Sequence, residues 1–218
     1  MKKNKIQIIE EIEHDLSILP DFILRDSLPE KTAIIVVDMI NGFASEGNLY
    51  SARVEKLIQP ISEIIHASKG MKKVFLCDRH PENAPEFESY LPHAIEGTKE
   101  ALIVEELYSI QDELSSVIFK NCTNGMMVKE MRRYLKANEA IETFIVIGDC
   151  TDICIMQFAL SLKAYFNELN LNKRVVVPIS LVETFDLELT KHDAELMSLF
   201  AFYNMKMNGI ELYQNIKI

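Results

Sequence analysis

The stretch that decides the fold runs from Thr143 to Cys154 and reads TFIVIGDCTDIC. Its first five residues are β-branched or aromatic, which is typical of a strand buried inside a parallel sheet. A helix is predicted directly afterwards, over Asp152–Asn167. A strand that enters a helix through a short turn is the repeating unit of an α/β protein.

The same unit recurs along the chain. Strands are predicted at Thr32–Val37, Lys73–Cys77, Ser116–Phe119, Thr143–Ile147 and Arg174–Pro178, with a sixth at an edge over Gly209–Tyr213. Further helices are predicted at Ala52–Ser68, Gly125–Ala137 and Thr190–Asn204. Strands that alternate with helices predict right-handed crossovers and a parallel sheet covered on both faces.

The chain divides into two predicted parts. Residues 1–31 are interpreted as an N-terminal helical appendage, with an amphipathic helix near Ile6–Ile18 that Pro20 and Pro29 follow. Residues 32–218 show no shift in composition, so we predict one domain there. The connection from Arg79 to Ser115 is long for a compact domain, and such connections are often functional.

Composition excludes several classes of protein. The chain has 218 residues, a formal net charge of −10 and four cysteines. The acidic balance argues against nucleic acid or an anionic membrane as partner. The cysteines are too few for a secreted disulfide framework, and neither a secretory signal nor an apolar run of about 20 residues is found. We therefore expect a cytoplasmic protein with reduced thiols and a small-molecule substrate.

Chemically active side chains follow four of the predicted strands. Ligands of open parallel sheets bind at the carboxyl ends of the strands. An acid, a lysine or a cysteine at one such position is usually a cap, a solvated charge or a packed side chain. Their combination at one sheet edge predicts a catalytic site, which contains Asp38, Asp78 with His80, Lys120, and the turn from Gly148 to Cys154.

Cys154 is the candidate nucleophile. It lies near the start of a predicted helix, where the helix dipole favours a thiolate and free backbone N–H groups can bind an oxyanion. Asp38 is the candidate base, and Lys120 would stabilise the developing charge.

Asp78, His80 and His93 suggest a metal site. Two imidazoles and a carboxylate suit Zn²⁺, Fe²⁺ or Mn²⁺, and Glu82, Glu86 or Glu88 would supply a further oxygen. The alternative is that these are surface residues of a polar loop.

Three segments resemble the isochorismatase-like cysteine hydrolases, and within them the nicotinamidases. They are IIVVDMINGF (34–43), VIFK (117–120) and IVIGDCTDICI (145–155), which agree with the family in order and spacing. The resemblance covers about residues 32–215. It implies an α/β fold, a three-layer α/β/α sandwich around a six-stranded, mostly parallel sheet.

The resemblance also implies the roles of the catalytic residues. Asp38, Lys120 and Cys154 match the family's catalytic Asp, Lys and Cys. The backbone N–H groups of Cys150 and Cys154 would bind the oxyanion, with a cis peptide bond between Asp149 and Cys150. Asp149 is a departure, because a small apolar residue is common at that position.

The nicotinamidase branch adds a metal site. DRHP (78–81) is similar to the branch's Asp-Trp-His-Pro, with Arg79 in place of Trp, and PHAIEGT (92–98) is similar to its Pro-His-x-x-x-Gly-Thr. The implied ligands are Asp78, His80, Glu86 and His93, with Glu88 as the alternative to Glu86. Zn²⁺ is the expected metal, with Fe²⁺ or Mn²⁺ as alternatives.

The implied activity is hydrolysis of nicotinamide to nicotinate and ammonia, a step of pyridine nucleotide salvage, through a cysteine thioester. Phe43 and Tyr90 would flank the substrate ring, unless both are core aromatics. Homo-oligomers are common in the family. A metal-free hydrolase of another small amide, a carbamoyl compound or a vinyl ether remains an alternative, as does a non-catalytic interaction protein. His192 is expected to have a capping or packing role.

Overall fold

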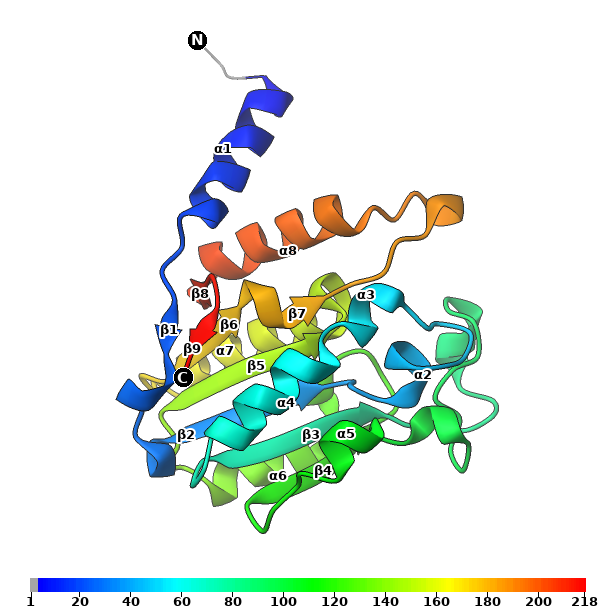
Figure 1. The fold of residues 1–218 in the computed structure, drawn as a ribbon, viewed down its shortest axis with the longest axis horizontal. Coiled ribbons are helices and arrows are strands. Elements are labelled where there is room, and N and C mark those ends of the chain that lie inside the picture. The colour runs from blue at the N-terminus through cyan, green and yellow to red at the C-terminus, as the bar shows by residue number, and fades with distance from the viewer. Residues whose placement is uncertain (1–3) are drawn as a thin grey trace.

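The structure, a computed structural model, describes residues 4–218. It confirms the predicted fold class: helices cover both faces of a parallel sheet (Figure 1). The strand order is β4-β3-β2-β5-β6-β8, and the short β7 pairs with the end of β5. The strands are β2 (Thr32–Val37), β3 (Lys72–Asp78), β4 (Ser115–Lys120), β5 (Thr143–Asp149), β6 (Arg174–Pro178), β7 (Val182–Glu183) and β8 (Glu211–Tyr213).

The central strands show why the sheet is buried. Every residue of β2 and β5 is buried, as expected for strands with a helical layer on each side. Because side chains alternate along a strand, Ile35 faces one apolar cluster and Ile34 the other. One cluster is closed by α6 (Lys129–Ala137), α7 (Met156–Glu168) and α8 (Ala194–Met207), and the other by α3 (Ala52–Glu55), α4 (Ile58–Ala67) and α5 (Glu105–Tyr108).

Several predicted helices are broken near their starts. The prediction of one helix over Ala52–Ser68 is wrong: α3 ends at Glu55 and α4 begins at Ile58. Pro60 has no N–H to donate to the carbonyl of Lys56, so a continuous helix would lose a bond there. Three predicted helices further along the chain begin as short separate turns: η5 (Gly125–Met127) precedes α6, η6 (Thr151–Ile155) precedes α7, and η8 (Glu188–Thr190) precedes α8.

The N-terminal segment has two parts. Residues 1–3 of the predicted appendage lie outside the described residues. Helix α1 (Lys5–Ser17) is capped by Asn4 and projects from the body (Figure 1). The chain then returns to the domain, where β1 (Phe22–Ile23) pairs in parallel with β9 (Ile216–Lys217). Short helical turns follow at η1 (Leu24–Asp26) and η2 (Pro29–Lys31).

The long connection after β3 is built from short elements. It contains η3 (Pro85–Glu88), η4 (Lys99–Ala101) and α5, while α2 (Asn41–Ala44) follows β2 and η7 (Ile179–Leu181) follows β6.

Within residues 4–218, no helix has the length and apolar character that crossing a membrane requires.

Candidate active site

Four parallel strands end at one edge of the sheet and deliver the predicted catalytic groups there. Asp78 and Lys120 are the last residues of β3 and β4 and lie opposite one another in the register. Asp38 follows β2 with a positive φ of 54°, which turns the chain away from the sheet. The backbone N–H of Asp78 donates to Asp38 Oδ1 at 2.8 Å. The strand ends thus meet as the sequence predicts.

The Lys120 ammonium group lies at the centre of this edge. Lys120 Nζ is 2.7 Å from Asp38 Oδ2, 2.6 Å from Asp78 Oδ1 and 3.6 Å from Cys154 Sγ. All four side chains are buried. The structure therefore brings together the three residues predicted to be catalytic and joins them to Asp78.

The buried charges differ in their preferred protonation state. Burial and the nearby Asp78 carboxylate raise the pKa of Asp38 to about 6, although Lys120 opposes the shift. Burial alone would raise the pKa of Asp78, but Lys120 and the two histidines hold it below its ordinary value. Burial would lower the pKa of Lys120, but both carboxylates hold it well above its ordinary value. Lys120 is therefore a permanent cation beside Cys154.

Cys154 lies in η6, a single π-helical turn between β5 and α7. Single π turns are frequent at functional sites. Burial raises the pKa of Cys154 well above its ordinary value, and the lowering effect of Lys120 is smaller. The resting group is thus a thiol, and a nucleophile made from it needs a base. Asp38 shares the Lys120 ammonium group with Cys154 and is the base that the geometry offers.

The turn between β5 and η6 carries the predicted cis bond between Asp149 and Cys150, which is confirmed. Gly148 precedes it with a φ of +117°, and a Cβ there would lie 2.0 Å from the carbonyl oxygen of Val37. Only glycine fits this contact. Asp149 is fully buried, and burial together with Asp38 raises its pKa well above the ordinary value, which favours its neutral form.

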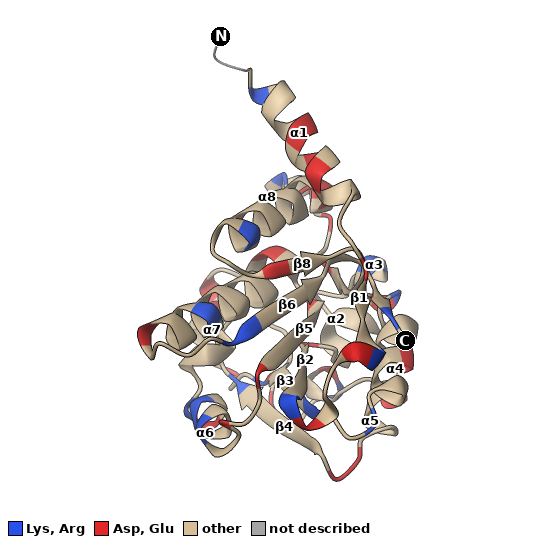
Figure 2. Cartoon of the chain, turned by 90° about the vertical axis from the view of Figure 1, so that its left-hand side faces the viewer, with Lys and Arg blue, Asp and Glu red and all other residues tan. Residues whose placement is uncertain are grey.

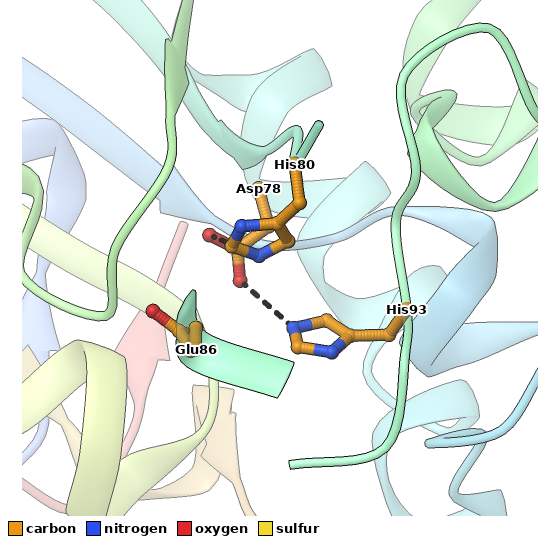
Figure 3. Close-up of side chains that lie close together, drawn as sticks. All are labelled: Asp78, His80, Glu86 and His93. Atoms are coloured by element: carbon orange, nitrogen blue, oxygen red, sulfur yellow. Dashed lines mark ion pairs between the residues drawn. The ribbon is translucent and has the colours of Figure 1, made fainter. Parts of the chain in front are cut away.

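A second group of side chains lies beside Lys120. The ligand atoms of Asp78, His80, Glu86 and His93 all lie within 4.8 Å of one another (Figure 3). Asp78 Oδ1 is 3.5 Å from His80 Nε2, and Asp78 Oδ2 is 3.8 Å from His93 Nε2. Glu86 comes from η3 and is half-buried, whereas Glu88 is exposed. The structure thus places Glu86 rather than Glu88 in the group.

The outer hydrogen bonds of the two histidines favour metal binding. His80 Nδ1 lies 2.7 Å from the side-chain oxygen of Asn121, and His93 Nδ1 lies 2.8 Å from the carbonyl oxygen of Leu91. Both partners accept, so a neutral imidazole at either position carries its proton on Nδ1 and leaves the Nε2 lone pair for a cation. His80 Nε2 is buried without a hydrogen-bond partner among the described residues. Two such nitrogens and two carboxylates fit a divalent cation.

Asp38, Asp78 and Cys154 form another close set of potential ligand atoms. The Lys120 ammonium group contacts all three. The charge of this set is therefore already balanced by the Lys120 ammonium group. Of the two sets, the one that contains both histidines is the better candidate for a metal site.

Aromatic rings surround His93. The ring of Phe43 is centred 5.4 Å from the His93 ring, and that of Tyr90 6.3 Å from it. Phe87, which the sequence analysis missed, is centred 5.5 Å from His80 and 5.6 Å from His93. Its position directly after Glu86, a candidate ligand, is the sequence feature that could have indicated a place in this pocket.

Arg79 does not take part in this pocket. Its neighbours Asp78 and His80 point inward along the end of β3, and Arg79 alternates outward. Its guanidinium lies 3.7 Å from the centre of the Phe119 ring, on the edge strand β4. The substitution of Arg for Trp therefore leaves that wall of the pocket to other residues.

His192 contacts the catalytic turn, which the sequence analysis did not predict. His192 Nε2 lies 2.9 Å from Asp152 Oδ2, and Asp152 is two residues before Cys154 in η6. His192 Nδ1 lies 2.8 Å from the carbonyl oxygen of Phe185, and the two rings stack at 4.1 Å. The segment before α8 is thus fastened to the turn that carries the nucleophile.

Comparison with known proteins agrees with this architecture. The chain belongs to the isochorismatase domain family, whose model matches residues 32–205. Nicotinamidase 1 of Arabidopsis thaliana is 29% identical over an alignment of 227 positions that covers 90% of this chain and 90% of the relative.

Two solved structures share the fold. A pyrazinamidase of Pyrococcus horikoshii, solved in complex with zinc, has a TM-score of 0.68 and 24% identity over 84% of this chain and 99% of its own. An N-carbamoylsarcosine amidase of Thermoplasma acidophilum has a TM-score of 0.67 and 23% identity over 84% of this chain and 95% of its own. Enzymes of different names therefore share this fold.

Proposed function

We propose that the protein is a metal-dependent amidohydrolase that converts nicotinamide to nicotinate and ammonia. The observation that carries the proposal is that the Cys154 thiol, 3.6 Å from the Lys120 ammonium, lies next to a four-ligand metal group that shares Asp78 with Lys120. A nicotinamidase relative that covers 90% of the chain supports the choice of substrate. The product, nicotinate, would enter pyridine nucleotide salvage. We propose a cytoplasmic location for the enzyme.

The proposed chemistry begins with a proton transfer. Asp38 takes the proton of the Cys154 thiol, and the thiolate attacks the amide carbonyl carbon. The backbone N–H groups of Cys150 and Cys154 stabilise the oxyanion, while Lys120 holds Asp38 in place. When the C–N bond breaks, Asp38 returns the proton to the leaving nitrogen, which departs as ammonia. Asp38 then deprotonates a water that attacks the thioester carbon; the C–S bond breaks, and the Cys154 thiolate takes the proton back from Asp38 as the acid product leaves.

Asp78, His80, Glu86 and His93 would hold the metal, with Zn²⁺ as the proposed ion. When bound, it supplies a Lewis acid that orients the pyridine nitrogen of the substrate. Phe43 and Tyr90 would flank the ring, and Phe87 closes the pocket behind the two histidines.

A metal-free hydrolase that acts on a carbamoyl compound or another small amide is the second candidate. The fold match to an N-carbamoylsarcosine amidase favours it. The metal group speaks against it, because His80 and His93 both turn Nε2 toward the Asp78 carboxylate and Glu86 joins them within 4.8 Å.

An ammonia-release assay tests the proposal. The protein is assayed on nicotinamide, pyrazinamide and N-carbamoylsarcosine, after chelation and after addition of Zn²⁺, Fe²⁺ or Mn²⁺. We expect turnover of nicotinamide that chelation abolishes and one of these metals restores. Cys154→Ala should lower kcat by at least about 10⁴-fold, whereas Cys122→Ala, a half-buried thiol close to Lys120 in sequence, should keep most of it. Metal-independent turnover of the carbamoyl compound alone would favour the second candidate.

A further inference from the structure

His93 enters the metal group from a loop rather than from the end of a strand. Asp78 is the last residue of β3 and His80 follows it two residues later, whereas His93 reaches Asp78 from a separate segment (Figure 3). The His93 ring is oriented by the carbonyl oxygen of Leu91, which lies 2.8 Å from Nδ1. The position of the His93 imidazole therefore depends on how this loop is held.

Ala94, directly after His93, has an uncommon backbone conformation. Its φ is +45°, in the left-handed region that a residue with a Cβ rarely adopts, and Ala94 is fully buried. Such a conformation persists where the surroundings fix it. The N–H of His80 donates to the Ala94 carbonyl oxygen at 3.0 Å, and the N–H of Ala94 donates to Glu100 Oε2 at 3.2 Å. Of these two bonds, only the second uses a side chain.

Glu100 is held in place by the loop that follows β2. It belongs to η4 and is half-buried. A Cβ on Gly47, which has a φ of +108°, would lie 2.6 Å from Glu100 Cδ, and one on Gly42 would lie 3.2 Å from Glu100 Cβ. Glycine at both positions thus leaves room for the glutamate against the segment that carries Phe43. The carboxylate therefore has a fixed place from which Oε2 reaches the N–H of Ala94.

We propose that Glu100 is a positioning residue of the metal group, which holds the loop after His93 so that the imidazole meets Asp78. The inference rests on the proposed function through its metal site alone, and not through the substrate. Glu100 is not one of the four residues whose ligand atoms lie within 4.8 Å of one another, so it acts through the bond to Ala94. Removal of a group that orients a metal ligand typically costs about 10–100-fold in metal affinity.

Charge alone would not single out Glu100. The chain has a formal net charge of −10, and acidic residues are spread over many of its helices and loops (Figure 2). A long-range attraction for a cation would therefore come from many acids, and salt screens it. Glu96 lies in the same loop, but its side chain is 63% exposed and lies 3.5 Å from Arg79. Glu100 differs from Glu96 by the hydrogen bond to Ala94.

Competition between the metal-free protein and a chromogenic chelator for Zn²⁺ tests the inference. Glu100→Ala removes the acceptor, so the affinity for Zn²⁺ should fall by about 10–100-fold. Glu100→Met keeps the length of the side chain but has no oxygen, and should give the same loss. Glu100→Gln loses the charge but keeps a side-chain oxygen that accepts, so its affinity should stay within about threefold of the wild type.

Glu96→Ala is the matched control, because it removes the same charge from the same loop. Its affinity for Zn²⁺ should also stay within about threefold of the wild type. Circular dichroism should show native helix content in every metal-free variant. Equal Zn²⁺ affinities of the wild type and Glu100→Ala, or equal losses in Glu100→Ala and Glu100→Gln, would overturn this inference alone. A wild-type protein that bound no Zn²⁺ would overturn both the inference and the proposed metal site.

Discussion

Lys120 holds the candidate site together at the level of single residues. Its ammonium group contacts two buried carboxylates and lies in contact distance of the Cys154 sulfur. A buried ion pair adds little net stability, but removal of one partner leaves charges without compensation. A substitution of Lys120 therefore tests its role in catalysis only if the loss of activity and the loss of stability are measured separately.

Lys120→Met should abolish the proposed activity and destabilise the protein. It leaves Asp38 and Asp78 facing each other without a cation, so we expect a loss of about 3–5 kcal/mol in the free energy of unfolding. The value of kcat/KM should fall by at least about 10³-fold. Urea unfolding and the ammonia-release assay measure the two quantities.

Lys73 is the matched control for Lys120. It is also buried and binds one acid, Asp112, at 2.6 Å, but it lies near the opposite end of β3. Lys73→Met should cost about 1–3 kcal/mol and leave kcat/KM within about twofold. If both variants lost activity in proportion to stability, Lys120 would be a structural lysine.

Glu86 and Glu88 offer a matched pair for the metal group. Both belong to η3, but only Glu86 lies in the group with Asp78, His80 and His93. Glu86→Gln should weaken Zn²⁺ binding by at least about 100-fold, and the exposed Glu88→Gln should leave it unchanged. Competition with a chromogenic chelator measures the affinity. Equal effects of the two substitutions would show that Glu86 is not a ligand.

The residues of the site were predictable where they follow strands and less so where they lie in loops. Asp38, Asp78 and Lys120 meet because parallel strands end at one edge. The choice between Glu86 and Glu88 depends on the single turn of η3, which spacing does not determine. The His192 contact joins residues 40 apart in the chain, and no local pattern announces it.

At the scale of elements, the bounds of the strands agree closely with those predicted from the sequence, whereas the starts of the helices do not. The strands Thr32–Val37 and Arg174–Pro178 have the predicted bounds, because a fully buried strand leaves a continuous apolar pattern. Helix starts are set by local bonds that periodicity ignores. Pro60, in the first turn of α4, cannot donate a helical hydrogen bond back toward α3, and the π turn of η6 precedes α7.

The segment before α8 is predicted to position the catalytic turn. His192→Asn should break the bond to Asp152 and lower kcat/KM by about 10–100-fold, because small displacements of a nucleophile cost that much. A positioning role predicts a lower kcat with little change in Zn²⁺ affinity. Asp152→Asn should give a similar loss, and the double variant should be no worse than either, since both remove one contact. His66→Asn, an exposed histidine of α4, should change nothing.

At the scale of the whole molecule, the strand order explains where the site lies. The chain begins the sheet at its centre with β2, adds β3 and β4 toward one edge, and then crosses back to add β5, β6 and β8 toward the other. The order therefore reverses between β2 and β5, and crevices form at such points beyond the carboxyl ends of the strands. Asp38 follows β2 and Cys154 follows β5, so the proposed base and nucleophile face each other across that crevice.

Part of the predicted N-terminal appendage packs against the domain. Helix α1 projects from the body, but Phe22 and Leu24 are 5% and 2% exposed and belong to the core cluster beneath α4. We therefore expect Phe22→Ala to cost about 3–5 kcal/mol in the free energy of unfolding, as for a core aromatic. Ile18→Ala, where the side chain is 66% exposed, should cost less than about 0.5 kcal/mol. Urea unfolding at one protein concentration compares the two, and equal small losses would mean that residues 20–26 are an appendage after all.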